Sequence, residues 1–136
     1  MKLMTRNTDY AVRAICHMAA KPQGVISVTE LVAELKIPRP FLRKILQMLS
    51  KSGLVTSYKG IGGGFRLEAK PDKIYLSDII KVFQGDFTLN ECFFKKKVCP
   101  NRQTCILKKR IDLIERRAQE EIGAITIGSL ITERQR

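Results

Sequence analysis

Three cysteines lie close together in a stretch that is otherwise rich in lysine and polar residues. Cys92, Cys99 and Cys105 are separated by six and five residues. Thiolate sulfur selects zinc, copper(I) or iron–sulfur clusters. Structural zinc sites and ferredoxin-type clusters use shorter gaps of about two to four residues. The wider spacing favours a loop wrapped over something larger than one ion, and it leaves four alternatives: an iron–sulfur cluster, thiol redox chemistry, zinc, or no chemical role.

The composition is that of one small domain. The chain has 136 residues, 44% of them hydrophobic, which is enough for one core. No run approaches the ~18 consecutive apolar residues of a membrane helix, and the first ten residues lack the apolar segment of a secretory signal. We therefore expect a cytoplasmic protein with no membrane partner. In that reducing compartment, the four cysteines suit ligands or sensors better than disulfides.

Positive charge is concentrated in the first half of the chain. The formal net charge is +12, and no acidic residue lies between Glu34 and Glu68. A long stretch of one sign attracts polyanions, whereas an ordinary solvated surface mixes glutamate with lysine. The pattern favours nucleic acid as the partner. The basic residues inside this stretch are Lys36, Arg39, Arg43, Lys44, Lys51, Lys59 and Arg66.

Two short helices are expected within this basic region. Ser27 and Glu30 form a capping-box pattern, in which each side chain satisfies a backbone donor of the other residue at the start of a helix. Ile37–Pro40 cannot continue that helix, but Pro40 suits the first position of a new one over Phe41–Ser52. With an earlier amphipathic helix over Thr8–Ala20, this arrangement predicts a helix-turn-helix whose second helix is basic.

A β-hairpin is expected directly after the second helix. Residues 54–58 and 65–67 have strand composition, and Gly60–Gly64 lies between them. The glycine loop lacks the Lys-Ser/Thr of a phosphate-binding loop and lies between two strands, so it predicts a mobile hairpin tip. The fold class expected is mainly α with a small β-hairpin wing, that is, a winged helix-turn-helix.

The rest of the chain is expected to contain three further helices. A short helix over Ile79–Gln84 precedes the cysteines, a long amphipathic helix runs from Thr104 to about Gly123, and a final short helix spans residues 126–134. The long helix has little core of its own to pack on, so we expect it to form a dimer seam. The resulting organisation is a DNA-binding domain over 1–84, a cluster loop over 85–105, and dimerisation and C-terminal helices over 106–136.

Four segments stand out beside the cysteine triplet: Thr8-Asp-Tyr-Ala-Val-Arg-Ala, Leu42 through Gly53-Leu-Val, Gly60-x-Gly-Gly-Gly-Phe, and Ile125-Thr-Ile-Gly-Ser-Leu. Together they resemble one family of bacterial transcription regulators, the Rrf-two family. The resemblance covers nearly the whole chain, and the discriminating parts are the wing and the cysteine triplet. It implies a homodimeric winged-helix regulator that binds a double-stranded DNA operator, and not an enzyme.

The resemblance also implies a cofactor. In cluster-binding members three cysteines hold a 2Fe-2S or 4Fe-4S cluster, and Cys92, Cys99 and Cys105 match those positions. Some members add a histidine three residues after the last cysteine, where this chain has Lys108. In others, which include nitric-oxide-sensitive repressors, an aspartate before Tyr-Ala of the first helix completes the cluster from the partner subunit. Asp9 occupies that place, although pairing with Arg13 and with the helix dipole would equally explain it.

The DNA contacts are expected on the second helix of the motif and on the wing. If that helix enters the major groove, the side chains near its start reach base edges, and the wing reaches phosphates or the minor groove. Phe41, Leu42, Ile45, Leu46 and Leu49 are expected in the core. The residues expected to contact DNA are Arg39, Arg43, Lys44, Gln47, Lys51, Tyr58, Lys59 and Arg66.

Together these features predict a repressor whose operator binding is switched by the state of an iron–sulfur cluster. The main alternative is a metal-free regulator that uses thiol redox, a small molecule or a protein partner. A small iron–sulfur carrier is a further alternative, but it has no use for the basic helix and wing. Cys16 is expected in the core as a small apolar residue, and His17 on the surface or partly buried.

Overall fold

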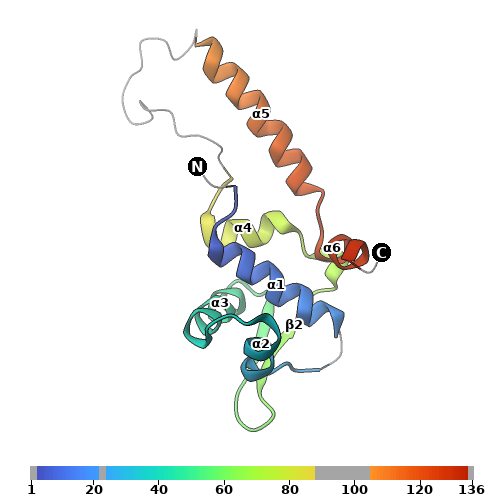
Figure 1. The fold of residues 1–136 in the computed structure, drawn as a ribbon. Helices are drawn as coiled ribbons and strands as arrows, with labels where there is room; N and C mark the ends of the chain where they lie inside the picture. Colours follow the sequence, from blue (N-terminus) through green and yellow to red (C-terminus); the bar gives the residue numbers. More distant parts are fainter. Residues whose placement is uncertain (1–2, 22–23, 88–104, 135–136) are drawn as a thin grey trace.

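A computed structural model describes residues 3–21, 24–87 and 105–134 of the chain. The fold is mainly helical with one two-stranded antiparallel hairpin, as the sequence predicted. Figure 1 shows a body of short helices with the hairpin at one end and a long helix leaving it at the other. The elements are α1 (Arg6–Ala20), α2 (Val28–Leu35), α3 (Arg39–Lys51), β1 (Val55–Tyr58), β2 (Gly64–Leu67), the 3-10 turn η1 (Pro71–Lys73), α4 (Leu76–Gln84), α5 (Ile106–Gly123) and α6 (Ile127–Arg134).

Helix α1 lies at the centre of the core. Its face formed by Ala11, Ala14, Ile15 and Met18 is buried and packs against α3, α4 and α6. Helix α3 contributes one side of its surface to the same core, because leucine and isoleucine recur at helical spacing along it. The four buried residues of α3 are Leu42, Ile45, Leu46 and Leu49.

The prediction that Phe41 belongs to the core was wrong. Its side chain is 57% exposed. Each residue of an α-helix turns the side chain by about 100°, so Phe41, one position before Leu42, points away from the stripe that contains Leu42 and Leu49. The prediction was wrong because Phe41 lies beside the edge of the buried stripe and was counted as part of it.

The predicted capping box at α2 forms only in half. The Ser27 hydroxyl accepts a hydrogen bond of 3.1 Å from the Glu30 backbone N–H, as expected. The Glu30 carboxylate instead accepts a 2.6 Å hydrogen bond from the Lys21 ammonium. That hydrogen bond lowers the pKa of the Glu30 carboxyl. The side chain of Glu30 therefore ties the end of α1 to the start of α2.

The wing contains a backbone pairing that the sequence did not predict. Val55 pairs with Leu67 and Tyr58 with Gly64 in the hairpin. Ile26, before α2, pairs with Phe65 through two backbone hydrogen bonds of 2.9 Å. Ile26 is thus attached to the outer edge of β2, which fixes the wing relative to α2.

Replacing Gly64 by alanine is expected to destabilise the protein by about 2–3 kcal/mol, because the new side chain meets the backbone of Ile26. A Cβ there would lie 2.1 Å from the Ile26 carbonyl oxygen, at a φ of +155°. Urea unfolding checks this prediction. Gly123→Ala is the matched control, since among the described atoms none lies within 4 Å of its Cβ. An equal loss of stability in both variants would contradict the close approach.

Helices α5 and α6 relate differently to this core. Figure 1 shows α5 running outward from the body, and in the described part of the chain none of its residues is buried. After α5 the chain returns: the Ile127 backbone N–H donates 2.8 Å to the Ile74 carbonyl, and the Ile127 side chain is fully buried. Within the described ranges, no helix combines the length and the apolar character that crossing a bilayer requires.

Candidate nucleic-acid interface and cysteine site

The basic residues of α3 lie on the side opposite the core. At about 100° per residue, all of them fall on one continuous surface of the helix, away from Leu42 and Leu49. Arg39 is also held in place, since its Nη2 donates a 3.1 Å hydrogen bond to the hydroxyl of Thr29 on α2. This helix can therefore present cationic donors along one exposed face. The exposed basic residues are Arg39, Arg43, Lys44 and Lys51, and the neutral side chain of Gln47 is exposed on the same face.

The wing adds a second cationic surface. Arg66 pairs with Thr56, two residues from Tyr58 along β1, so Arg66 and Tyr58 share one face of the hairpin. The Arg66 guanidinium carbon lies 5.5 Å from the centre of the Tyr58 ring, a cation–π distance that orders both side chains. Lys59 is exposed at the start of the hairpin loop. The predicted wing contacts are thus all on exposed positions.

Of the predicted cysteine ligands, only Cys105 lies within the described residues; Cys92 and Cys99 lie outside them. Cys105 is the N-cap of α5, and its Sγ accepts a 3.4 Å hydrogen bond from the Lys108 backbone N–H. The Cys105 sulfur therefore lies at the N-terminal end of α5, where the first backbone N–H groups have no partner within the helix. Lys108 offers no ligand, and its ammonium lies 2.6 Å from the Asp112 carboxylate.

Asp9 lies in the first turn of α1, as predicted. Its Oδ2 is 3.1 Å from the Arg13 Nε, and its side chain is 44% exposed. The helix dipole and Arg13 together account for an acidic residue here without any ligand role. Figure 1 shows that α5 begins at its outer end, far from α1, so one chain does not bring Asp9 next to Cys105.

A partly buried polar contact joins the start of α1 to the end of α4. The Gln84 Oε1 accepts hydrogen bonds of 2.9 Å from the Thr5 backbone N–H and of 2.7 Å from the Thr8 hydroxyl. Gln84 is the last residue of α4, immediately before the segment that carries the cysteines. This contact between Thr5, Thr8 and Gln84 was not predicted from the sequence. The Thr5–Thr8 spacing resembles a helix cap, but nothing local indicates a partner 76 residues away.

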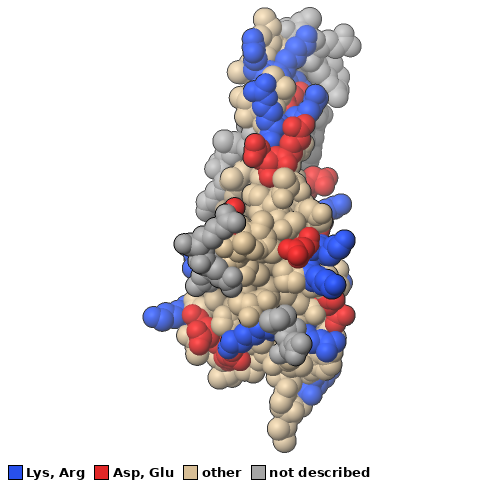
Figure 2. All heavy atoms as spheres, turned by 90° about the vertical axis from the view of Figure 1, so that its right-hand side faces the viewer, with Lys and Arg blue, Asp and Glu red and all other residues tan. Residues whose placement is uncertain are grey.

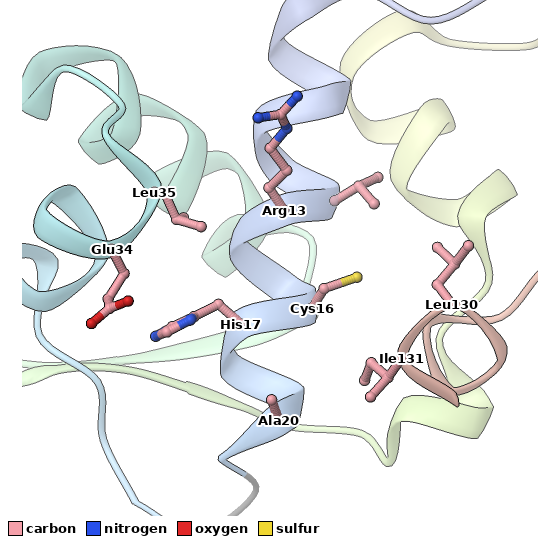
Figure 3. A pocket seen from close by; sticks show the side chains of 9 residues that line it. Arg13, Cys16, His17, Ala20, Glu34, Leu35, Leu130 and Ile131 are labelled. Carbon is pink, nitrogen blue, oxygen red and sulfur yellow. The ribbon is translucent and has the colours of Figure 1, made fainter. Parts of the chain in front are cut away.

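A cleft of about 770 Å³ lies between α1, α2 and α6. Figure 3 shows Cys16 and His17 from α1 on its wall, with Glu34 from α2 and Leu130 from α6 across from them. Cys16 was predicted to lie in the core, but it is only half-buried: it packs against the core and also faces this cleft. The His17 side chain is 18% exposed, and its Nε2 lies 3.7 Å from the Glu30 carboxylate.

No metal centre is visible in the described ranges, where no three side chains of His, Cys, Asp or Glu stand together in a way that could hold an ion. The cleft therefore offers space and mixed polarity, and Cys16 and His17 do not form an ion site there with a third donor.

The family profile described as Rrf2, iron-dependent transcriptional regulator, matches residues 4–133. The chain belongs to the Rrf2 family. Its relatives include a helix-turn-helix-type regulator of Aquifex aeolicus strain VF5, 35% identical over 124 residues, which span 90% of this chain and 86% of that protein. NsrR of Bacillus subtilis strain 168 is 34% identical over 110 residues, which span 79% of this chain and 75% of that protein.

The Rrf2 assignment extends to the fold. The solved structure of CymR, described as the global cysteine regulator of B. subtilis, superposes with a TM-score of 0.81 over 98% of both chains at 23% identity. This Rrf2-family protein is therefore a DNA-binding transcription regulator of the winged helix-turn-helix type, and not an enzyme. The carrier-protein alternative falls with that assignment, whereas the family leaves cluster-dependent and metal-free regulation both open.

Proposed function

We propose that this protein is an iron–sulfur-cluster-sensing repressor, a cytoplasmic homodimer whose binding to a palindromic operator depends on the state of the cluster. The ligands would be Cys92, Cys99 and Cys105 of one subunit and Asp9 of the other. The observation that most supports this proposal is the position of Cys105, a thiol that caps α5 and accepts a backbone hydrogen bond. A bound cluster would supply iron that responds to redox change and to small ligands.

The donor set fits such a group as far as the chain is described. Hydrogen bonds to cysteine sulfur stabilise cluster thiolates and tune their potential, and Cys105 receives one from Lys108. Lys108 stands where some family members have a histidine, and its ammonium has no lone pair for iron, so the proposal takes the fourth ligand from elsewhere. Asp9 is a partly exposed carboxylate with one ion-pair partner, so it can turn toward a ligand position.

A dimer is supported by the apolar surface of α5. In the described structure Ile106 and Leu107 are 74% and 70% exposed, and Leu113 and Ile114 are 38% and 53% exposed. These residues recur at helical spacing, so a second copy of α5 can cover them. Two-fold symmetry would then carry each α5 toward the other subunit, which is consistent with Asp9 acting across the interface.

The contacts around Gln84 supply a route from the cysteine segment to the DNA-binding helix. Gln84 holds Thr5 and Thr8 at the start of α1, and α1 packs directly against α3. A change at the end of α4 therefore moves the helix on which α3 rests. A nearly complete switch of operator occupancy requires a preference of about 5.5 kcal/mol between the two dimer arrangements.

Asp9→Ala is expected to alter the visible absorption of anaerobically purified protein and to accelerate the loss of iron. Arg13→Ala is the matched control, because it breaks the same 3.1 Å ion pair but leaves the carboxylate in place. The ion pair contributes only about 0.3–0.5 kcal/mol to stability, so both variants should stay folded. If Asp9→Ala retained the spectrum and the operator response of the unmodified protein, Asp9 would not be a ligand.

A metal-free regulator that responds to a small molecule is the second candidate. The cleft between α1, α2 and α6 favours it, since about 770 Å³ falls within the usual ~300–1,000 Å³ of ligand pockets. Colour and iron content separate the two candidates. DNA binding by colourless, iron-free protein that responds to neither iron nor sulfide would support the second.

A further inference from the structure

Ile61 stands alone at the end of the wing. Its side chain has 110% of its reference exposure, the largest value among the exposed large hydrophobic residues of the described chain. Isolated apolar residues on a surface are ordinary. The position of Ile61 is not, because hairpin tips normally carry glycine and polar residues, which solvent tolerates and which turn geometry prefers.

The turn that presents Ile61 has a defined geometry. The Gly63 backbone N–H donates a 3.0 Å hydrogen bond to the Gly60 carbonyl, which closes a four-residue turn with Ile61 at its second position. Gly62, at the third position, has a φ of +77°, as a type II turn requires. A Cβ on Gly63 would lie 2.4 Å from the Tyr58 carbonyl oxygen, so the turn is folded tightly back on the hairpin. Ile61 is therefore at the corner of a hydrogen-bonded turn, and the predicted mobility of the hairpin tip stays a prediction.

The residues next to this corner include cations that can contact DNA. Lys59 precedes it, and Arg66 lies over Tyr58 on the adjoining face. Figure 2 shows the wing projecting below the body with no charged side chain at its tip, while basic side chains lie above it. A phosphate is bound by hydrogen-bond donors, and the Ile61 side chain has none. The cations can contact the two phosphate backbones of a DNA duplex while the uncharged tip enters the groove between them.

We propose that Ile61 enters the minor groove beside each half-site as an apolar wedge that bends the operator. Wedges of isoleucine, leucine, methionine or phenylalanine partly unstack a base step and kink the duplex. Pyrimidine–purine steps unstack most easily, so the wedge selects such a step at a position that no side chain reads by hydrogen bonding. The proposal rests on DNA binding by this Rrf2-family regulator, and it does not require the cluster.

The test uses the full-length protein in whichever cluster state binds DNA more tightly. Operators are selected from a random double-stranded DNA library, and bending is measured by energy transfer between dyes at the two ends of a selected duplex. Ile61→Ala is expected to bind this duplex about tenfold more weakly, which corresponds to about 1.4 kcal/mol. It should also lose most of the bend and the preference for a pyrimidine–purine step flanking each half-site.

Two further variants separate the wedge from other effects. Ile61→Met should retain the bend, because methionine also acts as a wedge. Lys59→Ala should weaken binding to all sequences alike and reduce the salt dependence while leaving the step preference. Ile61 is fully exposed in the described structure, so thermal unfolding of Ile61→Ala should match that of the unmodified protein.

Equal bending and equal step preference in Ile61→Ala and the unmodified protein would overturn the wedge, as would a weakening that is uniform over all sequences. Failure of the cluster proposal has a separate signature. Protein that contains no iron even when it is purified without oxygen, but that bends DNA through Ile61, would sink the cluster while supporting the wedge.

Discussion

Cys105→Ser is expected to abolish the cluster: iron and acid-labile sulfide in anaerobically purified protein should fall to background. Thiolate sulfur is a soft ligand, and a serine hydroxyl is a poor substitute for it. The substitution should not weaken α5, because Cys105 is the N-cap and serine is a preferred residue there. The loss would therefore report on the ligand and not on the fold. Operator binding should at the same time stop responding to iron supply and to oxidants.

Cys16→Ser is the matched control for this prediction. Cys16 lies on α1 among residues of the core and the cleft, away from the start of α5. Its replacement should cost some stability but leave the iron content unchanged. Equal iron content in the unmodified protein and in Cys105→Ser would show that this cysteine is not a ligand. If the iron were instead lost in Cys16→Ser, the site would have to be placed at the cleft.

Raising the salt concentration from 50 to 200 mM is expected to weaken operator binding by ~10³- to 10⁵-fold, which is the fall produced by about six to ten phosphate contacts. The exposed cations of α3 and the wing can supply that number across a dimer. Fluorescence anisotropy over a salt series measures the slope of log affinity against log salt concentration. Lys44→Ala removes one cation from each subunit, and it should reduce this slope by about one for each phosphate contact that is lost.

The control for the salt series is Lys109→Ala. Lys109 is equally exposed but lies near the outer end of α5, away from α3 and the wing (Figure 1). Its replacement should leave the slope unchanged. A slope near zero for the unmodified protein, or an equal reduction in both variants, would mean that the acid-free stretch of sequence is not the DNA-binding surface.

The helices could be predicted from the sequence because their signals are local. Ser27 caps α2, and Gly85 ends α4 within a residue of where the pattern placed it. Contacts between distant segments had no such signal. The pairing of Ile26 with Phe65 depends on backbone groups that any residue possesses, and the contact of Gln84 with Thr8 joins residues whose side chains occur on many surfaces.

In the candidate site, too, the parts with local sequence signals could be predicted and the parts that depend on distant segments could not. The cationic face of α3 follows from helical spacing alone, because Leu42 and Leu49 define the buried side and the arginines and lysines must lie opposite. Phe41 shows the limit of that reasoning, since one residue of offset separates core from surface. The proposed role of Asp9 cannot follow from one chain, because its ligand partners would belong to a second subunit.

Native mass spectrometry of oxygen-protected, unmodified protein is the sharpest test of cluster binding, because it counts iron and sulfide atoms on an intact dimer. We expect a dimer that carries equal numbers of iron and sulfide atoms on each subunit, and their loss when Cys105 is replaced by serine. A dimer with the bare mass of two chains, which binds its operator identically with and without Cys105→Ser, would contradict this expectation.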